Sequence, residues 1–182
     1  NVLVQEILPH IKEVPIFVAG GIGRGEIILK FLQLGAAGCQ IGTRFVCANE
    51  SIAHSKFKNI FIKSEARNAQ ISVKIDDRLP VIPVRAIENS ATQNFISEQK
   101  KLINLVEKKE ISLKDAQLSI EHFWAGSLKK AVIDGDVESG SLMAGQSVSL
   151  VKKLQSVSEI FNELTQQMKS QINFEQKDSN NG

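Results

Sequence analysis

Two short stretches of the chain combine glycine with residues that could bind an anion. Ala19-Gly20-Gly21-Ile22 ends one apolar run, and Gln40-Ile41-Gly42-Thr43 ends the next. Because glycine has no Cβ, its backbone N–H can approach an anion closely, and a threonine adds a hydroxyl donor. The pair of stretches therefore predicts a phosphate-binding site. The alternative is that these glycines only make tight turns.

Arg44 directly follows the second glycine stretch. Its guanidinium could neutralise a bound phosphate, or it could pair with a carboxylate at the surface. The sequence leaves both roles open.

Three histidines could act as a general base, because imidazole titrates near neutral pH. None of them stands in a glycine loop beside a serine, cysteine or carboxylate group. We interpret His10 as a surface residue and His122 as a packed or hydrogen-bonded residue near Trp124. His54 follows the second glycine stretch and could contact a substrate.

Asp134, Asp136 and Glu138 alternate within a glycine-rich turn, a pattern that can hold a divalent metal. They lack the spacing of an EF-hand, so turn formation or capping is the favoured interpretation, and we expect no metal. Cys39 and Cys47 lie in apolar surroundings without CxxC spacing. We interpret them as reduced, buried thiols, with a disulfide or metal pair as the alternative.

Composition restricts the class of protein. The chain has 182 residues, of which 42% are hydrophobic, enough for one domain with a core. Its 22 Lys and Arg and 20 Asp and Glu give a net charge of +2, which argues against nucleic-acid binding. No apolar run approaches the roughly 18 residues of a membrane span, and we expect no signal peptide at the start. We expect a cytoplasmic protein with a small-molecule substrate and no nucleic-acid or membrane partner, and a homodimer stays open.

The glycine stretches lie in a pattern of alternating helices and strands. Apolar spacing predicts helices over residues 1–11 and 26–34, and strands over 16–19 and 37–42. The first strand is predicted to be buried on both faces, and a loop is predicted from Thr43. Helix and strand in alternation, with short connections, indicate a parallel α/β fold.

After residue 50 the pattern becomes mainly helical. Ser112 is the expected N-cap of one helix, with Asp115 at its third position. Residues 71–84 are predicted to be extended or looped and 135–140 to turn. Residues 171–182 are predicted to be a disordered tail. The helices are predicted over 51–69, 91–106, 113–125, 128–133, 143–154 and 157–168.

The first residues carry a further indication. Asn1 is not a start residue, and the first helix is already under way where the chain begins. We expect the chain to be a fragment, or to lack its front portion.

Two longer stretches, which contain the glycine motifs, resemble a known protein family. Val14-Pro15-Ile16-Phe17-Val18-Ala19-Gly20-Gly21-Ile22, with Leu34-Gly35-Ala36-Ala37-Gly38-Cys39-Gln40-Ile41-Gly42-Thr43-Arg44-Phe45, resembles the nitronate monooxygenase (2-nitropropane dioxygenase-like) family. FMN-dependent enoyl-acyl-carrier-protein reductases belong to the same superfamily. Further similar stretches, which carry the resemblance to about residue 165, are 50–51, 83–89, 122–126 and 134–146.

The resemblance implies an α/β fold, the C-terminal portion of a (β/α)8 TIM barrel with an inserted, mainly helical substrate domain. Residues 1–50 would hold strands 7 and 8 with the FMN phosphate loops. Residues 51–125 would be the insertion, 126–170 the C-terminal barrel helices and 171–182 the tail. The cofactor would be FMN, held by Gly20, Gly21, Gln40, Ile41, Gly42 and Thr43, with Met143 and Gln146 close to the flavin.

The family's catalytic histidine stands in a Gly-Gly-His stretch that this sequence lacks, and we expect it upstream of Asn1. The implied activity of the whole protein is FMN-dependent oxidation of alkyl nitronates by O2, which residues 121–126 favour. One alternative is an NAD(P)H-dependent enoyl-ACP reductase on the same barrel. A third reading, from another class, is a non-catalytic truncated remnant.

Overall fold

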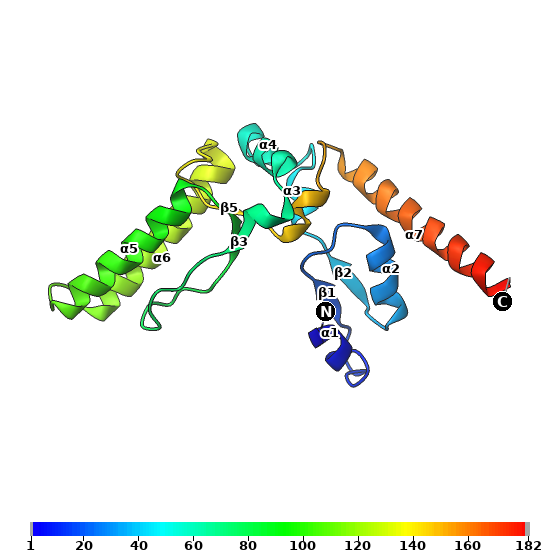
Figure 1. The fold of residues 1–182 in the computed structure, drawn as a ribbon, viewed down its shortest axis with the longest axis horizontal. Coiled ribbons are helices and arrows are strands. Elements are labelled where there is room, and N and C mark those ends of the chain that lie inside the picture. The colour runs from blue at the N-terminus through cyan, green and yellow to red at the C-terminus, as the bar shows by residue number, and fades with distance from the viewer. Residues whose placement is uncertain (1, 181–182) are drawn as a thin grey trace. The chain divides into compact units, whose positions relative to one another are not determined.

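The computed structural model describes residues 2–180, which form two compact units (Figure 1). Unit 1 comprises the chain up to Ser51 and again from Leu150 onward. Unit 2 comprises Ile52–Ser149. The division departs from the predicted boundary at residue 125, because residues 126–149 group with 52–125. Backbone pairing is the reason, since Ser141 N donates to Ser127 O at 2.9 Å within unit 2.

Unit 1 contains the predicted alternation of helices and strands. The two strands pair in parallel, with Val18 opposite Cys39 and Ala19 opposite Gln40, so their carboxyl ends share one edge of the sheet. The elements are α1 Val2–Ile7, β1 Phe17–Ala19, α2 Gly25–Gln33, β2 Gly38–Gln40, α3 Thr43–Val46 and α7 Val157–Asn180. The chain is an α/β protein, and its described residues do not close a barrel.

The sheet of unit 1 is covered on one face. Val18 is buried beside Leu8, Ile22 and Ala36, whereas Phe17 and Ala19 on either side of it are exposed. The prediction that this strand is buried on both faces was therefore wrong for the described residues, because helices pack against one side only. A short helix, α3, also stands where a loop was predicted.

Helix α7 continues past the predicted start of the tail. It runs to Asn180, so residues 171–180 are helical, and residues 181–182 lie outside the described part of the chain. Contacts with α2 account for the difference. Lys30 Nζ pairs with Glu175 at 2.5 Å and Gln33 donates to the same carboxylate at 3.0 Å. The hydrogen bond from Lys30 makes the largest contribution to lowering the pKa of Glu175 to about 2, and hydrogen bonds from Gln171 and Gln33 add to it.

The chain passes from unit 1 to unit 2 after Ser51 and returns at Leu150. The segments next to these two points are bonded to each other within unit 1. Ala48 forms an isolated parallel bridge with Gln155, and Asn49 N donates to Gln155 O at 2.8 Å. The Glu50 carboxylate accepts the N–H of Val157 at 3.0 Å. The segment that leaves unit 1 is thus bound to the segment that returns.

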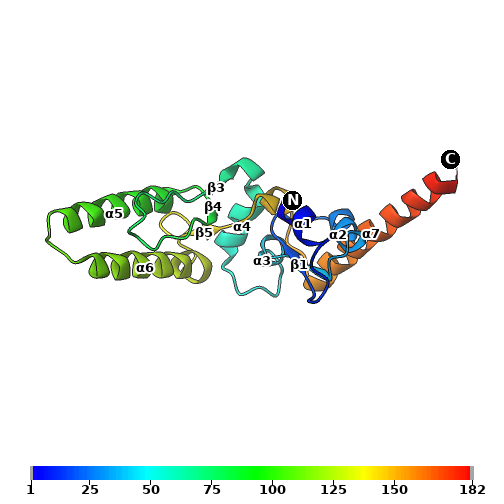
Figure 2. The same cartoon turned by 90° about the horizontal axis from the view of Figure 1, so that it is seen from below.

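Unit 2 is built on a helix pair and a small sheet. Helices α5 and α6 lie side by side (Figures 1 and 2), and a three-stranded antiparallel sheet has the order β3-β4-β5. The elements are α4 Ser55–Lys63, β3 Ala69–Ile71, β4 Arg85–Ile87, α5 Ser90–Glu107, α6 Leu113–Lys129, a π-helical turn Lys130–Asp134 and β5 Leu142–Met143. Short 3₁₀ turns cover Ala66–Asn68 and Gln146–Leu150.

The predicted caps and the predicted helix over residues 143–154 had different outcomes. Ser112 Oγ accepts the N–H of Asp115 at 3.1 Å and caps α6, which confirms the prediction. The helix over 143–154 was wrong, because Met143 pairs with Ala86 in the sheet and only a 3₁₀ turn follows. This sheet was not predicted.

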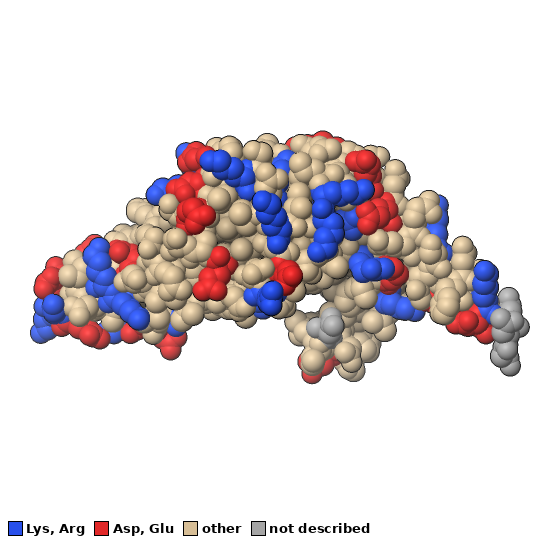
Figure 3. All heavy atoms as spheres, turned by 45° about the horizontal axis from the view of Figure 1, so that its top comes forward, with Lys and Arg blue, Asp and Glu red and all other residues tan. Residues whose placement is uncertain are grey.

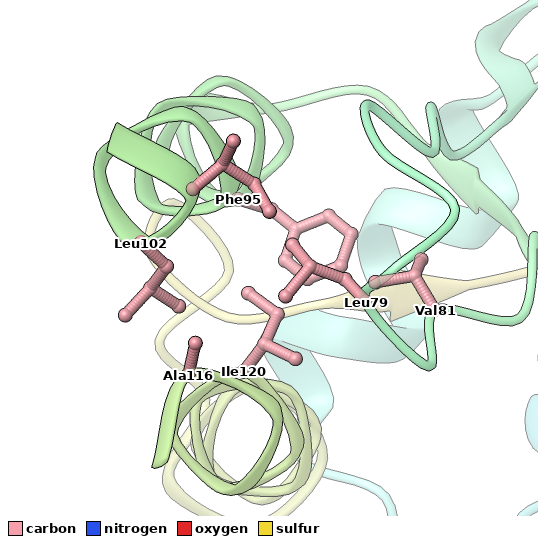
Figure 4. Close-up of a cluster of buried hydrophobic side chains, with 7 residues drawn as sticks. Leu79, Val81, Phe95, Leu102, Ala116 and Ile120 are labelled. Atoms are coloured by element: carbon pink, nitrogen blue, oxygen red, sulfur yellow. The ribbon is translucent and has the colours of Figure 1, made fainter. Parts of the chain in front are cut away.

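The core of unit 2 fills the space between the helices and the loop after β3 (Figure 4). Leu79 and Val81 come from that loop and pack on Phe95 and Ile120. Because the loop contributes a fully buried side chain, Leu79, it forms part of the core.

Charges of both signs are interspersed over the face drawn in Figure 3, in keeping with the small net charge.

Candidate functional site

The two glycine stretches emerge at one edge of the sheet of unit 1. Gly20 and Gly21 follow β1 with φ of 92° and 71°, a left-handed conformation that L side chains rarely adopt. Ile22 is buried in the core and holds the end of this loop. Gly42 follows β2 and precedes α3. The parallel pairing therefore brings the two loops to the same end of neighbouring strands.

Glycine at position 42 is not required by the fold of the described residues. Its φ of −99° and ψ of −66° are open to other residues, and a Cβ built there would meet no atom within 4 Å. The space in front of Gly20 and Gly21 is equally open, whereas a Cβ at Gly25 would overlap the Leu164 carbonyl oxygen. A glycine that its own chain does not need leaves room for the close approach of a ligand.

The other predicted phosphate residues lie beside these glycines. Gln40 ends β2 and is exposed, Ile41 is half-buried, and Thr43 is the half-buried first residue of α3. The structure thus brings six of the predicted cofactor residues to one region of unit 1. Met143 and Gln146 belong to unit 2, where Met143 is half-buried in β5 and Gln146 is exposed.

Arg44 pairs with a carboxylate, in a buried position. The guanidinium Nη2 lies 2.6 Å from Glu163 Oε2, and Nη1 donates to Gly23 O at 2.9 Å. Gln155 accepts from Nη2 at 3.3 Å and donates to Glu163 at 2.9 Å. Only 6% of Arg44 is exposed, so of the two roles left open the carboxylate pair is the one observed, in a buried position and not at the surface. Arg44 ties α3 and α7 to the end of the first glycine loop.

This ion pair gives the stability of unit 1 a pH dependence. The hydrogen bond from Arg44 makes the largest contribution to lowering the pKa of Glu163 below its usual value of 4.5, and the hydrogen bond from Gln155 makes the next largest. A lowered carboxyl pKa contributes stability above pH 4.5, and this contribution is lost as the pH falls through the folded-state pKa. Glu163→Gln should reduce the free energy of unfolding at pH 7 by about 1–2 kcal/mol. Urea unfolding should show this difference shrinking below pH 4.5.

Glu26→Gln is the matched control for that measurement. Glu26 also has a lowered pKa, caused by Arg24, but the Arg24 side chain is 55% exposed. An exposed pair contributes about 0–1 kcal/mol, so the control should change little. Equal losses in the two variants would contradict the bracing role of Arg44.

None of the three histidines is placed beside a group that it could activate as a general base. His10 is exposed, as predicted, and His122 is exposed on α6, which contradicts its predicted packing. His54 is the N-cap of α4, where its Nδ1 accepts the N–H of Lys56 at 3.1 Å. Its ring fills the space beside Gly135, where a Cβ would overlap the imidazole. These contacts give His54 a structural role.

The acidic turn is held by its own hydrogen bonds. Asp136 accepts from the backbone N and the Oγ of Ser139, both at 3.0 Å, and these bonds lower its pKa. Within residues 2–180 no group of three or more His, Cys, Asp or Glu could hold a metal ion. Cys39 is half-buried and Cys47 is buried, and neither forms a disulfide within the described residues.

Asn89 organises this turn, and the sequence analysis did not single it out for that role. It caps α5 by accepting the N–H of Thr92, and its Nδ2 donates to Val137 O at 2.7 Å and Gly140 O at 2.8 Å. An asparagine before a helix signals the cap. Its hydrogen bonds to Val137 and Gly140 could not be predicted, because no pattern near residue 89 indicates partners so far along the chain.

None of the helices in residues 2–180 combines the length and apolar character that crossing a bilayer requires.

Comparisons with known proteins agree on one family. A family model described as nitronate monooxygenase matches residues 2–167. A probable nitronate monooxygenase of Staphylococcus saprophyticus is 28% identical over 139 residues, which cover 71% of this chain and 37% of that protein. A probable nitronate monooxygenase of Staphylococcus aureus is 28% identical over 137 residues, covering 68% of this chain and 36% of that protein.

Solved structures resemble the chain along nearly its whole length. FabK from Thermotoga maritima has a TM-score of 0.74 at 27% identity, covering 97% of this chain and 50% of its own. A nitroalkane oxidase from Streptomyces ansochromogenes has a TM-score of 0.65 at 21% identity, covering 94% of this chain and 44% of its own, and shows the fold alone. The chain spans between one third and one half of the length of these proteins.

Proposed function

This chain belongs to the nitronate monooxygenase family, and from that premise we propose that the protein containing it oxidises alkyl nitronates with O2 and FMN. The family is one of FMN-dependent oxidoreductases. Bound FMN would supply the redox chemistry, taking electrons from the nitronate and passing them to oxygen, with a carbonyl compound and nitrite as products. The chain's own residues contribute binding and positioning.

One observation carries the cofactor proposal. Gly42 has backbone angles open to other residues and open space where a Cβ would stand, at the same sheet edge as Gly20 and Gly21. A phosphate fits there, because backbone N–H groups could approach it without obstruction. The loops after the last two strands of a (β/α)8 barrel frequently bind phosphate. The proposed phosphate residues are Gly20, Gly21, Gln40, Ile41, Gly42 and Thr43.

Other residues would support this site. Arg44 is a positioning residue, because it binds Gly23 O and fixes the end of the first loop. We also propose Met143 and Gln146 as residues close to the flavin. Among the described residues no histidine is assigned as a general base, since His54 is engaged as a cap and His10 and His122 are exposed.

An enoyl-ACP reductase that uses NAD(P)H on the same flavin barrel is the second candidate. The likeness to FabK from Thermotoga maritima favours it, at 27% identity and a TM-score of 0.74. The phosphate site proposed here would serve either reaction. The two candidates therefore differ in their substrates and in the reductant.

Purification of the full-length protein tests the proposal. We expect the absorbance of bound flavin, and oxygen uptake when an alkyl nitronate is added. Oxidation of NAD(P)H that depends on an enoyl thioester, without nitronate activity, would replace the proposal with the second candidate. A protein that neither retains nor takes up FMN would contradict both candidates.

A further inference from the structure

An apolar pocket in unit 2 is lined by residues of the helix pair and of the loop after β3. It has a volume of about 240 Å³, and its walls include Val81, Ile82, Val84, Phe95, Ile120 and Trp124. Drug-sized sites measure about 300–1,000 Å³, so this cavity suits a smaller molecule. Figure 4 shows three of these residues, Val81 on the loop, Phe95 on α5 and Ile120 on α6.

A second, smaller cavity lies in the same unit. Phe95 and Trp124 line both cavities, and their ring centroids lie 4.5 Å apart. The smaller cavity measures about 20 Å³, which is close to the space that one water-sized group needs. Hydroxyls of Ser72, Thr92, Ser127 and Ser141 belong to residues on its walls.

Ser141 has an unmet hydrogen-bonding demand in this smaller cavity. Only 5% of the residue is exposed, and its Oγ has no hydrogen-bond partner among the described residues. Leaving a buried hydroxyl unpaired is unfavourable, because it has lost its hydrogen bonds to water and gained none in return. A group that enters the cavity and bonds to Oγ would recover this cost.

The charge of the lining selects against anions. Among the residues that line the two cavities none is cationic, and Glu121 is the one with a charge. A carboxylate or phosphate would lose its hydration there without finding a counter-charge, and Glu121 would repel it. A neutral molecule avoids both costs.

The loop that forms part of the pocket wall is held in place by side-chain hydrogen bonds from both helices. Gln99 is fully buried in α5, where its Nε2 donates to Val73 O at 2.9 Å and its Oε1 accepts the N–H of Ile75 at 3.0 Å. Gln117 on α6 donates to Arg78 O at 2.8 Å. The loop is thus bound to both helices, so a ligand would find the cavity already formed, which lowers the cost of binding.

We propose that unit 2 binds a small neutral amphiphile, an alkyl chain with one uncharged hydrogen-bonding group. The alkyl chain of the ligand lies against Trp124 and Ile120, and its polar group forms a hydrogen bond with Ser141 Oγ. This site lies wholly within Ile52–Ser149. It does not rest on the flavin proposal, and its test needs no flavin.

Trp124 provides the readout, because the chain has one tryptophan and no tyrosine. We expect 1-hexanol to cause a saturable change in the emission of Trp124 in the 182-residue chain. Hexanoate should bind at least about ten-fold more weakly, because it carries an anion. Ser141→Ala should weaken the binding of 1-hexanol about ten-fold, which corresponds to about 1.4 kcal/mol.

Two further variants keep the test decisive. Ser97→Ala, on the exposed face of α5, should leave the binding of 1-hexanol unchanged. Ile82 is 78% exposed, so Ile82→Lys should fold and should raise the affinity for hexanoate relative to 1-hexanol. The proposal is overturned by an unsaturable response to 1-hexanol, by equal affinities for the two probes, or by full affinity in Ser141→Ala.

Discussion

Replacement of Gly42 by valine is expected to abolish FMN retention by the full-length protein. The valine side chain would occupy the open space in front of Gly42, where we place the phosphate. Displacing the phosphate would break the charge-assisted hydrogen bonds that the glycine loops would donate to it, each worth about 1.5–3 kcal/mol. The affinity should therefore fall by at least about 100-fold, which flavin absorbance after gel filtration would show.

The flavin-free protein supplies the control for this variant. Because a Cβ at Gly42 meets no protein atom within 4 Å, the valine should leave the thermal unfolding midpoint nearly unchanged. Gly42→Ala should lose less affinity than Gly42→Val, because its side chain is smaller. Unchanged flavin occupancy in a folded Gly42→Val protein would show that the phosphate lies elsewhere.

Replacement of Gly25 by alanine is expected to destabilise the chain by about 1–3 kcal/mol, the usual cost of overpacking. Gly25 begins α2 where that helix meets α7, and a Cβ would overlap the carbonyl oxygen of Leu164. A backbone carbonyl cannot rotate away, so the two helices would have to separate. That movement would also weaken the hydrogen bond from Gly25 N to Gln167 Oε1, which measures 2.7 Å. Urea unfolding monitored by circular dichroism measures the loss.

Gly126→Ala is the matched control, because it makes the same change at an exposed position within α6. A Cβ at Gly126 meets nothing within 4 Å, and alanine restricts the unfolded chain more than glycine does. This variant should gain about 0.5–1 kcal/mol. A Gly25→Ala protein as stable as the parent would show that α2 and α7 pack less closely than described.

The parts of the fold that the sequence predicts are those with local signals. The parallel pair β1 and β2 follows from two apolar runs that end in glycine, and the cap of α6 follows from Ser112 with Asp115. The six residues proposed to bind phosphate could be grouped for the same reason, because strand order and glycine placement are both local patterns.

The parts that escaped prediction depend on contacts between distant residues. Met143 was predicted to be helical, but its backbone pairs with Ala86, in a strand of three residues. Arg44 could not be assigned to Glu163, because nothing near either residue identifies the other as its partner. The polar end of α7 is similar, since Lys30 and Gln33 bind Glu175 from another helix.

The clamp at Ala48, Asn49 and Gln155 has a consequence for how this protein can diverge. Because the segments that leave and re-enter unit 1 are bound to each other, the ends of the intervening segment are held together, as in a closed loop. Closing a flexible loop costs only about 0.6 kcal/mol more for each doubling of its length. Relatives could therefore lengthen, shorten or exchange the insertion at little cost in stability, and so acquire new substrates while the glycine loops stay unchanged.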